Sequence, residues 1–343
     1  MKAVAYSSKI CEKELLIKAN NKKHDITLIS NRLTLDTISY AKGKDVVLAF
    51  SCDDLSAPIL YKLKEMGVKY VSTRSSGTDH IDLTKADSLG LKIANVPAYS
   101  PESVAEHAIS LILSLLRNII PAHKQMLEHD FSLNNLVGST LRNKTVGIVG
   151  LGRSGKVLAQ ILRGFGAKIL VNDIRDVSEE CTSYSARQVS YDEILKESDI
   201  ISFHVPLSES TRHMVDREAI IKMKARVMLI NVSRGAIFNT KDVLDALQDE
   251  KISKLGMDVY EFEHNVFFFN HSRNPIQDPL LKALIQHSRV LLTPHMAFLT
   301  EEALQVIAEQ TILNLDLWEA GHTPVNSCTI GIKTGIVPKA ISA

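Results

Sequence analysis

Cysteine is scarce in this chain of 343 residues, and its four cysteines stand far apart, without a C-x-x-C pair. They are Cys11, Cys52, Cys181 and Cys328. A zinc site or a disulfide framework needs cysteines in closely spaced sets, so the sequence argues against both. We therefore expect no bound metal.

An excess of charge of one sign is also missing, because 40 lysine and arginine residues face 39 aspartate and glutamate residues, for a formal net charge of +1. Without a basic block, we expect no binding to nucleic acid or to a membrane surface. The longest apolar run, residues 108–116, is interrupted by serine and is far shorter than the roughly 20 residues that span a bilayer. No signal-peptide pattern opens the chain. We expect a cytoplasmic protein whose partners are small molecules.

The most informative stretch is residues 144–156, where a run of β-branched residues leads into closely spaced glycines in the pattern G-x-G-x-x-G. Apolar residues at helical spacing follow. A strand, a tight turn and a helix in this order bind phosphate, because unpaired N–H groups at the helix start face the anion. We expect this glycine turn to bind the pyrophosphate of a dinucleotide through Gly150, Gly152, Arg153, Ser154 and Gly155.

A second strand, residues 168–172, follows the turn and ends at Asp173. An acid about 20 residues after the last glycine accepts hydrogen bonds from the adenosine ribose and repels a 2′-phosphate. Asp173 therefore favours NAD over NADP. The same glycines match most of the G-x-x-x-x-G-K-[ST] loop of nucleoside triphosphatases, but Val157 stands where that loop needs a hydroxyl to hold magnesium.

The first hundred residues alternate short apolar segments with more polar, helical ones. Strands are expected at residues 2–6, 26–29, 46–50, 69–72 and 92–96, and helices at residues 12–19, 34–41, 58–66 and 83–90. This alternation predicts an open sheet of five parallel strands. Two prolines within residues 95–101 end the pattern and mark a hinge.

A second alternating series begins at the glycine turn. Six strands are expected near residues 145–149, 168–172, 199–203, 227–232, 254–258 and 289–293, with helices at 153–165, 191–197, 217–223 and 240–249. This order predicts a doubly wound sheet, after which a helix at 300–320 returns to the first domain. The expected α/β fold has two doubly wound parallel-sheet domains. A Rossmann cofactor domain, residues 101–298, is inserted in a flavodoxin-like substrate domain, residues 1–100 and 299–343.

Between the two series, a long helix is expected from Pro101, capped by Ser100, to about residue 129, with a kink at Pro121. Its apolar positions cover more than one face, which is too many for a helix packed on one side only. A second buried face implies a subunit partner or deep burial between the domains. We favour a homodimer that forms through this 101–129 helix.

Three charged side chains follow apolar strands of the second series: Arg234, Glu263 and His295. Side chains just past the carboxyl ends of parallel strands line the ligand crevice. Arginine offers a planar fork to a carboxylate, histidine can transfer a proton near neutral pH, and a glutamate can hold the histidine ring. Taken singly, each also has an ordinary interpretation: a surface ion pair, a solvated loop acid and a capping residue, respectively.

Taken together, the motifs resemble the D-2-hydroxyacid dehydrogenase family, most closely its D-lactate dehydrogenase branch and the related vancomycin-resistance D-lactate dehydrogenases. The matching segments follow one another in the family's order. They are residues 74–82, 95–101, 103–107, the glycine turn, and residues 204–206, 231–235, 258–261 and 293–295.

The resemblance implies hydride transfer between NAD and a 2-hydroxy acid in a cleft between the domains. Arg234 would bind the carboxylate of the 2-oxo acid and polarise its carbonyl group. His295 would protonate the carbonyl oxygen, and Glu263 would orient His295.

The resemblance also implies further contacts. Ser76 and Gly77 would receive the other carboxylate oxygen of the substrate, and Tyr99 and Phe298 would wall its side-chain pocket. Asp258 would bind the nicotinamide carboxamide. The rest of the cofactor groove would consist of His204, Val205, Pro206, Thr211, Val232 and Ser233. The alternative interpretation for Tyr99 and Phe298 is ordinary packing in the core. For His204 it is a histidine at a strand end whose hydrogen bonds are all made within the protein.

Three features depart from the family pattern and bear on substrate choice. Met296 stands where a small polar residue commonly follows the histidine, and Asn239 replaces an acid after the arginine motif. The segment of residues 262–276 is longer and more aromatic than the same segment in many relatives, and it resembles that of the vancomycin-resistance branch. Because Asp173 follows the second strand, unlike in that branch, NADH remains the expected cofactor.

The expected reaction is the reduction of pyruvate, or another short 2-oxo acid, to the D-2-hydroxy acid. Enzymes for 2-hydroxyisocaproate and for glyoxylate or hydroxypyruvate stay open, because one methylene in an apolar pocket changes binding by only about 1–3 kcal/mol. An NAD-sensing, corepressor-like binding protein with the same fold and trio is the alternative from another class.

Overall fold

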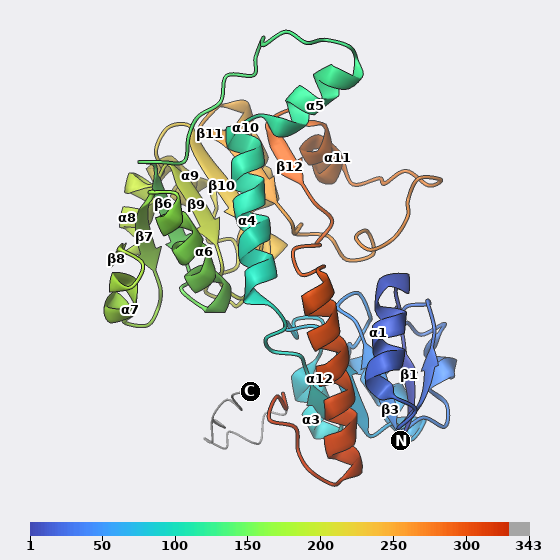
Figure 1. The fold of residues 1–343 in the computed structure, drawn as a ribbon. Coiled ribbons are helices and arrows are strands. Elements are labelled where there is room, and N and C mark those ends of the chain that lie inside the picture. Colours follow the sequence, from blue (N-terminus) through green and yellow to red (C-terminus); the bar gives the residue numbers. More distant parts are fainter. Residues whose placement is uncertain (329–343) are drawn as a thin grey trace. The chain divides into compact units, whose positions relative to one another are not determined.

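The computed structural model describes residues 1–328 and divides the chain into two compact units (Figure 1). Unit 1 consists of Met1–Tyr99 and the chain from Glu301 onward, and unit 2 consists of Ser100–Thr300. Part of the expected substrate domain, residues 329–343, lies outside the described residues. Each unit has its own parallel sheet and core, which confirms the expected α/β fold.

Unit 1 is built on a five-stranded parallel sheet with the order β2-β1-β3-β4-β5. The register places Ala3 beside Val46, and Val47 beside Val71. This order is that of flavodoxin-like sheets, and all five expected strands form. They are β1 (Lys2–Ala5), β2 (Asp25–Leu28), β3 (Val46–Ala49), β4 (Tyr70–Thr73) and β5 (Lys92–Ala94).

Helices cover both faces of this sheet. Because side chains alternate along a strand, Val47 joins the core under α2 while Leu48 joins the core with Leu315 and Trp318 of α12. Burial of each large apolar side chain stabilises the fold by about 1.5–3 kcal/mol. The helices of unit 1 are α1 (Ile10–Asn20), η1 (Ile38–Ala41), α2 (Ala57–Glu65), α3 (Leu83–Ser88) and α12 (Glu301–Glu319).

The helix expected over residues 34–41 was wrong for its first half, because only the 3-10 turn η1 forms there. The side chain of Thr37 satisfies the local backbone instead. The hydroxyl of Thr37 accepts a hydrogen bond of 2.9 Å from the N–H of Thr34 and donates one of 2.5 Å to the carbonyl oxygen of Arg32. Such local bonds compete with helix formation.

Unit 2 contains a seven-stranded parallel sheet with the order β12-β11-β10-β9-β6-β7-β8. Strand order reverses between β6 and β9, as in doubly wound dinucleotide-binding sheets. The sequence predicted six of these strands and missed β8, a three-residue edge strand with no fully buried residue. The strands are β6 (Thr145–Val149), β7 (Lys168–Asn172), β8 (Ala186–Gln188), β9 (Ile200–Phe203), β10 (Val227–Asn231), β11 (Ile252–Met257) and β12 (Val290–Leu292).

One face of this sheet packs on α4 and α6, and the other packs on α8 to α11. Ile112 and Leu158 belong to the first core, and Leu244 and Leu281 belong to the second. The sequence missed the short helices α7 and α11. The helices of unit 2 are α4 (Pro101–Leu116), α5 (Ile119–Leu127), α6 (Arg153–Gly164), α7 (Ser178–Thr182), α8 (Tyr191–Glu197), α9 (Arg217–Lys222), η2 (Gly235–Ile237), α10 (Thr240–Gln248) and α11 (Pro279–Gln286).

The single helix expected over residues 101–129 is in fact two helices, α4 and α5, which meet at 61°. Ser100 caps α4 as predicted, because its hydroxyl accepts a hydrogen bond of 3.1 Å from the N–H of Ser103. The chain breaks at Asn118, which has a left-handed φ of 52°. Pro121 causes no kink, because it lies in the first turn of α5. Backbone N–H groups in the first turn have no partner within the helix, so the N–H that proline lacks is not needed there.

The apolar excess of α4 is buried within unit 2, where Ala108, Leu111, Ile112 and Leu115 join the core shared with α6. The apolar side chains of α5 remain largely exposed, as Ile119 shows. Within residues 1–328 no single helix is long and apolar enough to cross a membrane, and α4 and α5 reach that length only as a bent pair.

Candidate active site

The carboxyl edge of the unit 2 sheet carries the three charged residues that the sequence singled out. Arg234 follows β10, Glu263 follows β11 and His295 follows β12. These strands are neighbours in the order β12-β11-β10. Because the strands are parallel, their carboxyl ends lie at the same edge, where open α/β sheets bind their ligands.

His295 and Glu263 form a hydrogen-bonded pair. Nδ1 of His295 lies 2.7 Å from Oε1 of Glu263, and the two side chains are 20% and 25% exposed. The other carboxylate oxygen of Glu263 accepts a hydrogen bond of 2.9 Å from the N–H of Tyr260. A carboxylate on Nδ1 fixes the tautomer and the ring orientation, so Nε2 is the nitrogen left for proton transfer.

A buried carboxylate clamps the loop after β12. Asp258, at the end of β11, is fully buried, and it accepts hydrogen bonds from the N–H groups of Met296 at 2.8 Å and Ala297 at 2.7 Å. The hydroxyl of Thr293 donates at 2.5 Å, and the His107 ring lies 3.4 Å away. Burial acts to raise the pKa of Asp258, but these donors outweigh it, so the pKa is lowered and the group stays ionised.

His295 has a left-handed backbone conformation, with a φ of 54°. Its N–H donates to the carbonyl oxygens of Asp258 at 2.6 Å and Thr293 at 3.0 Å. Such a conformation costs a non-glycine residue about 1–3 kcal/mol and persists only where the surroundings fix it. The clamp therefore sets the position of the imidazole. The expected contact of Asp258 with the nicotinamide carboxamide stays a prediction.

The Arg234 loop packs directly on the segment that leads to Glu263. A Cβ atom at Gly235 would lie 2.0 Å from the carbonyl carbon of Tyr260, so only glycine fits there. The carbonyl oxygen of Arg234 accepts a hydrogen bond of 2.8 Å from the Asn231 side chain, which fixes the turn after β10. Because of this backbone contact, the loop that carries Arg234 cannot move without moving the loop that carries Glu263.

The glycine turn has the geometry that a pyrophosphate requires. Gly150 has a left-handed φ of 97°, and a Cβ atom on Gly155 would lie 2.1 Å from the carbonyl oxygen of Gly150. A Cβ atom on Gly152 would meet nothing within 4 Å, so the space there is open. Helix α6 begins at Arg153 without a side-chain cap. The N–H groups in the first turn of a helix can bind an anion, so the residues of this turn fit the pyrophosphate of NAD.

Asp173 follows β7 beside the glycine turn. One of its oxygens accepts a hydrogen bond of 2.8 Å from the N–H of Leu151, and the guanidinium of Arg175 contacts both oxygens. Burial acts to raise the pKa of Asp173, but the hydrogen bonds from Arg175 and Leu151 outweigh it and the pKa is lowered. The acid is therefore charged at neutral pH.

The loop after β9 lies against the same turn, since a Cβ atom on Gly150 would be 2.8 Å from the carbonyl oxygen of His204. The His204 ring sits between the hydroxyls of Ser154 at 3.2 Å and Ser202 at 2.9 Å. Burial lowers the pKa of His204 to about 4, so the ring is neutral at physiological pH. The other expected cofactor residues also follow β9 or β10: Val205, Pro206, Thr211, Val232 and Ser233.

The expected substrate residues are divided between the units. Ser76 and Gly77 follow β4 of unit 1, and Tyr99 follows the neighbouring strand β5. The hydroxyl of Ser76 donates to the carbonyl oxygen of Pro97 at 3.3 Å. Phe298 belongs to unit 2 and is half-buried. The contacts of these residues with a substrate stay predictions.

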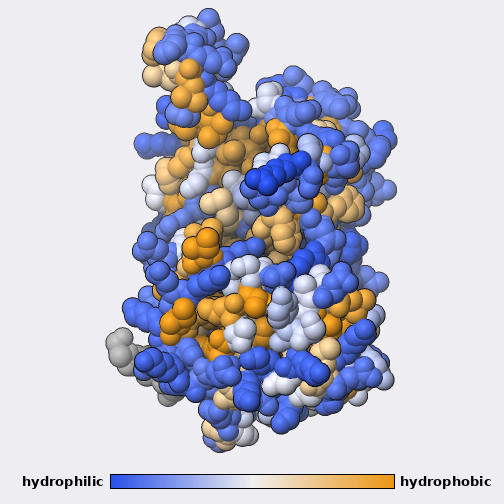
Figure 2. All heavy atoms as spheres, turned by 90° about the vertical axis from the view of Figure 1, so that its right-hand side faces the viewer, coloured by the Kyte–Doolittle hydropathy of each residue, from blue (hydrophilic) through white to orange (hydrophobic). Residues whose placement is uncertain are grey.

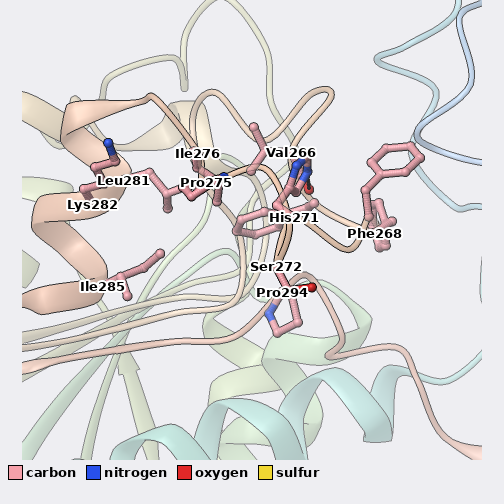
Figure 3. A pocket seen from close by; sticks show the side chains of 12 residues that line it. Val266, Phe268, His271, Ser272, Pro275, Ile276, Leu281, Lys282, Ile285 and Pro294 are labelled. Atoms are coloured by element: carbon pink, nitrogen blue, oxygen red, sulfur yellow. Dashed lines mark hydrogen bonds between the residues drawn. The ribbon is translucent and has the colours of Figure 1, made fainter.

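An apolar pocket of about 540 Å³ adjoins the His295 loop (Figure 3). Figure 3 shows Phe268 at one side of this pocket. The centre of its ring lies 5.6 Å from the centre of the His295 imidazole. Phe268 has a φ of 71°, so both ring partners have left-handed backbones. The lining consists of Val266, Phe267, Phe268, Phe269, His271, Ser272, Pro275, Ile276, Leu281, Lys282, Ile285 and Pro294.

Sequence reasoning missed several residues at this edge. Nε2 of His107 on α4 lies 2.9 Å from the hydroxyl of Thr293, a role that its place in the family motif at residues 103–107 could have suggested. Arg175 was missed although it follows Asp173 by two positions. A second histidine–glutamate pair, His213 and Glu261 at 2.5 Å, joins the loops after β9 and β11, and no pattern in the sequence predicts it.

Comparison with known proteins gives consistent results. Residues 109–297 match the family described as D-isomer specific 2-hydroxyacid dehydrogenase, NAD binding domain. A D-lactate dehydrogenase of Curvularia clavata is 40% identical over 336 residues, covering 96% of each chain. A D-lactate dehydrogenase of Escherichia coli (strain K12) is 39% identical over 327 residues, covering 95% of this chain and 99% of that protein.

The fold is also similar to solved structures. The D-lactate dehydrogenase of Aquifex aeolicus, complexed with NAD and lactic acid, has a TM-score of 0.85 and 31% identity, covering 93% of this chain and 96% of that chain. The family match covers the glycine turn and the trio of Arg234, Glu263 and His295. The chain therefore belongs to the D-2-hydroxyacid dehydrogenase family, and unit 2 contains its NAD-binding domain.

Proposed function

We propose that the protein is a D-lactate dehydrogenase that reduces pyruvate with NADH. The observation that carries this proposal is the His295–Glu263 pair, at 2.7 Å, on the sheet edge that also presents Arg234 and the glycine turn. The two relatives at 40% and 39% identity, both named D-lactate dehydrogenases, support pyruvate as the substrate.

Each residue of the trio has a separate task. The Arg234 guanidinium binds the substrate carboxylate through two hydrogen bonds and polarises the neighbouring carbonyl group. Bound NADH supplies a hydride to the carbonyl carbon. Nε2 of protonated His295 donates a proton to the carbonyl oxygen, so the reaction consumes one NADH and one proton and yields the 2-hydroxy acid and NAD. Glu263 orients the imidazole through its hydrogen bond to Nδ1.

The nearest alternatives are other D-2-hydroxyacid dehydrogenases, acting on 2-hydroxyisocaproate, glyoxylate or hydroxypyruvate. Purified protein should therefore be assayed with NADH against pyruvate, phenylpyruvate, 2-oxoisocaproate, glyoxylate and hydroxypyruvate, with chiral analysis of the product. We expect the highest kcat/KM for pyruvate and a D-configured product. A higher value for another oxo acid would reassign the substrate, and binding of NADH without turnover of any of them would favour the corepressor-like alternative.

We also infer a homodimer that forms through α5 and the segment after it. Exposed apolar side chains support this inference, and Figure 2 shows apolar atoms on the part of unit 2 that projects at the top of the view. Light scattering should give twice the chain mass of 38.0 kDa, and Leu133→Asp should lower it. The chain mass alone would contradict the dimer. The exposed apolar residues are Ile119, Ile120, Met126, Leu127, Phe131, Leu133 and Val137.

A cytoplasmic location is the third part of the proposal. All four cysteines are free thiols, as expected in a reducing compartment. Fractionation of the source cells should recover the protein with the soluble contents, and recovery in the membrane or secreted fraction would contradict this location.

A further inference from the structure

The loop that follows β9, residues 204–213 and here called the β9 loop, is fastened at both ends to parts of the candidate active site. At its start, a backbone carbonyl oxygen lies 2.8 Å from the place that a Cβ atom on Gly150 would take. At its end, the N–H of His213 donates a hydrogen bond of 2.8 Å to the carbonyl oxygen of Ala236 in η2, just after Arg234. The β9 loop therefore connects the glycine turn to the segment that carries Arg234.

The side chain of His213 forms the second histidine–glutamate pair of this sheet edge. Its Nε2 atom lies 2.5 Å from Oε1 of Glu261, and the two side chains are 36% and 9% exposed. The other oxygen of Glu261 accepts a hydrogen bond of 3.1 Å from the N–H of Thr240, the first residue of α10. Glu261 stands two residues before Glu263. One carboxylate thus joins the β9 loop, the start of α10 and the loop that carries Glu263.

These contacts hold His213 in a backbone conformation that costs free energy. Its φ is 51°, in the left-handed region, which a non-glycine residue keeps only where its surroundings fix it. The next residues continue the attachment, because Val215 forms a parallel β-bridge with Phe238. Backbone and side chain together therefore fix the end of the β9 loop against both neighbouring loops.

The middle of the β9 loop is held together by its own hydrogen bonds. The hydroxyl of Thr211 donates a bond of 2.7 Å to the carbonyl oxygen of Pro206 and accepts one of 2.8 Å from the N–H of Ser208. The N–H of Arg212 also donates to the carbonyl oxygen of Ser208 at 2.9 Å. The loop is thus a compact turn whose place depends on its two fastened ends, and it contains two of the residues expected in the cofactor groove, Pro206 and Thr211.

We infer that His213 and Glu261 are positioning residues for hydride transfer. Their hydrogen bond holds the β9 loop, and with it the nicotinamide half of bound NADH, against the loops that carry Arg234 and Glu263. A displacement of about 1 Å between reacting groups slows a reaction by about 100-fold, so a contact that fixes these loops acts on the rate without touching the reacting atoms. The inference rests on the proposed function for the reaction that it assists.

The test compares the full chain with His213→Ala, after circular dichroism has shown that the variant is folded at the assay temperature. The loosened loop must be ordered when the cofactor binds, so the Kd for NADH in a calorimetric titration should rise about three- to tenfold. The kcat for pyruvate should fall at least about tenfold. With NADH deuterated at the transferred position, the isotope effect on kcat should be at least as large as in the wild type, because hydride transfer is the step that is slowed.

Further variants separate positioning from general stabilisation. Glu261→Ala should reproduce the changes of His213→Ala, and the double variant should lose no more than either single one, because both remove the same contact. His213→Gln keeps an N–H donor for Glu261 and should stay within about threefold of the wild type in kcat. Glu261→Gln keeps the size but not the charge, and its kcat should fall at least about threefold, so it carries the test if the alanine variants do not fold. His322→Ala removes an exposed histidine of unit 1 and is the matched control.

The outcomes that overturn the inference differ from those that overturn the proposed function. Wild-type Kd and kcat in His213→Ala, additive losses in the double variant, a reduced isotope effect, or wild-type kcat in Glu261→Gln would each overturn the inference alone. If the wild type binds NADH but reduces no 2-oxo acid, the proposed function fails, and an unchanged Kd for NADH in His213→Ala would still count against the positioning pair.

Discussion

The carboxylate of Asp258 accepts a hydrogen bond of 2.7 Å from the N–H of Ala297, which ties the end of β11 to the loop that carries His295. The acid is completely buried, and the bond connects residues from two neighbouring strand ends. The position of the proposed proton donor therefore depends on a carboxylate outside the trio of Arg234, Glu263 and His295.

Asp258→Asn tests this dependence. The amide nitrogen of asparagine cannot accept the N–H bonds of Met296 and Ala297, so one buried donor loses its partner. We expect the free energy of unfolding to fall by about 1–3 kcal/mol in a urea titration, and kcat to fall by more than about tenfold. The exposed Asp249→Asn variant is the matched control. Wild-type stability and kcat in Asp258→Asn would show that the clamp is dispensable.

Gly235→Ala should separate the two loops that carry Arg234 and Glu263. The added Cβ atom would lie 2.0 Å from the Tyr260 backbone, which must move and take Glu263 with it. We expect kcat/KM to drop by about 100-fold or more, since a displacement of about 1 Å at a catalytic group has that effect. Gly164→Ala, where the added atom meets nothing within 4 Å, should retain activity. Equal activity of the two variants would contradict the contact.

Stability should depend on pH through His204. Its pKa is lowered from 6.5 to about 4 in the folded chain, so the unfolded chain takes up this proton first as the pH falls. Above pH 6.5, His204 therefore does not make the free energy of unfolding depend on pH. Between pH 6.5 and pH 4 this free energy falls because of His204, by about 3 kcal/mol in total. Urea titrations at pH 7.5 and pH 5 should show a smaller loss for His204→Asn than for the wild type. Equal losses would mean that His204 keeps its ordinary pKa.

Phe268 should limit the size of the substrate side chain, because its ring lies beside the imidazole of His295. In Phe268→Ala, the ratio of kcat/KM for phenylpyruvate to that for pyruvate should rise about tenfold or more, which is the scale of one or two methylene groups. Phe269→Ala, at a more exposed neighbour, is the control. An unchanged ratio would place Phe268 outside the substrate pocket.

The sequence predicted the elements whose residues are apolar over a whole strand or turn. All five strands of unit 1 and six of unit 2 were found, because each contains a short segment rich in apolar side chains. Strand β8 was missed because its three residues, Ala-Arg-Gln, form no apolar run. The break at Asn118 was missed because asparagine, unlike proline, can also continue a helix.

The site was partly predictable for a related physical reason. Arg234, Glu263 and His295 each follow a recognisable strand, so parallel topology places them at one edge. The partners in the contacts around Asp258 were not predicted, since His107 and Asp258 are far apart in the chain and only the family motifs, not a local pattern, mark the two residues. Arg175 was passed over because Asp173, two positions before it, already explained the motif, although the Arg175 guanidinium contacts both oxygens of that acid.

The most direct test of the account is the kinetics of His295→Gln. This side chain can still hydrogen-bond but cannot donate the proton, so kcat for pyruvate reduction should fall by about 10²–10⁴-fold while the Kd for NADH stays within about twofold. A kcat equal to that of the wild type would contradict the assignment of His295 as the proton donor.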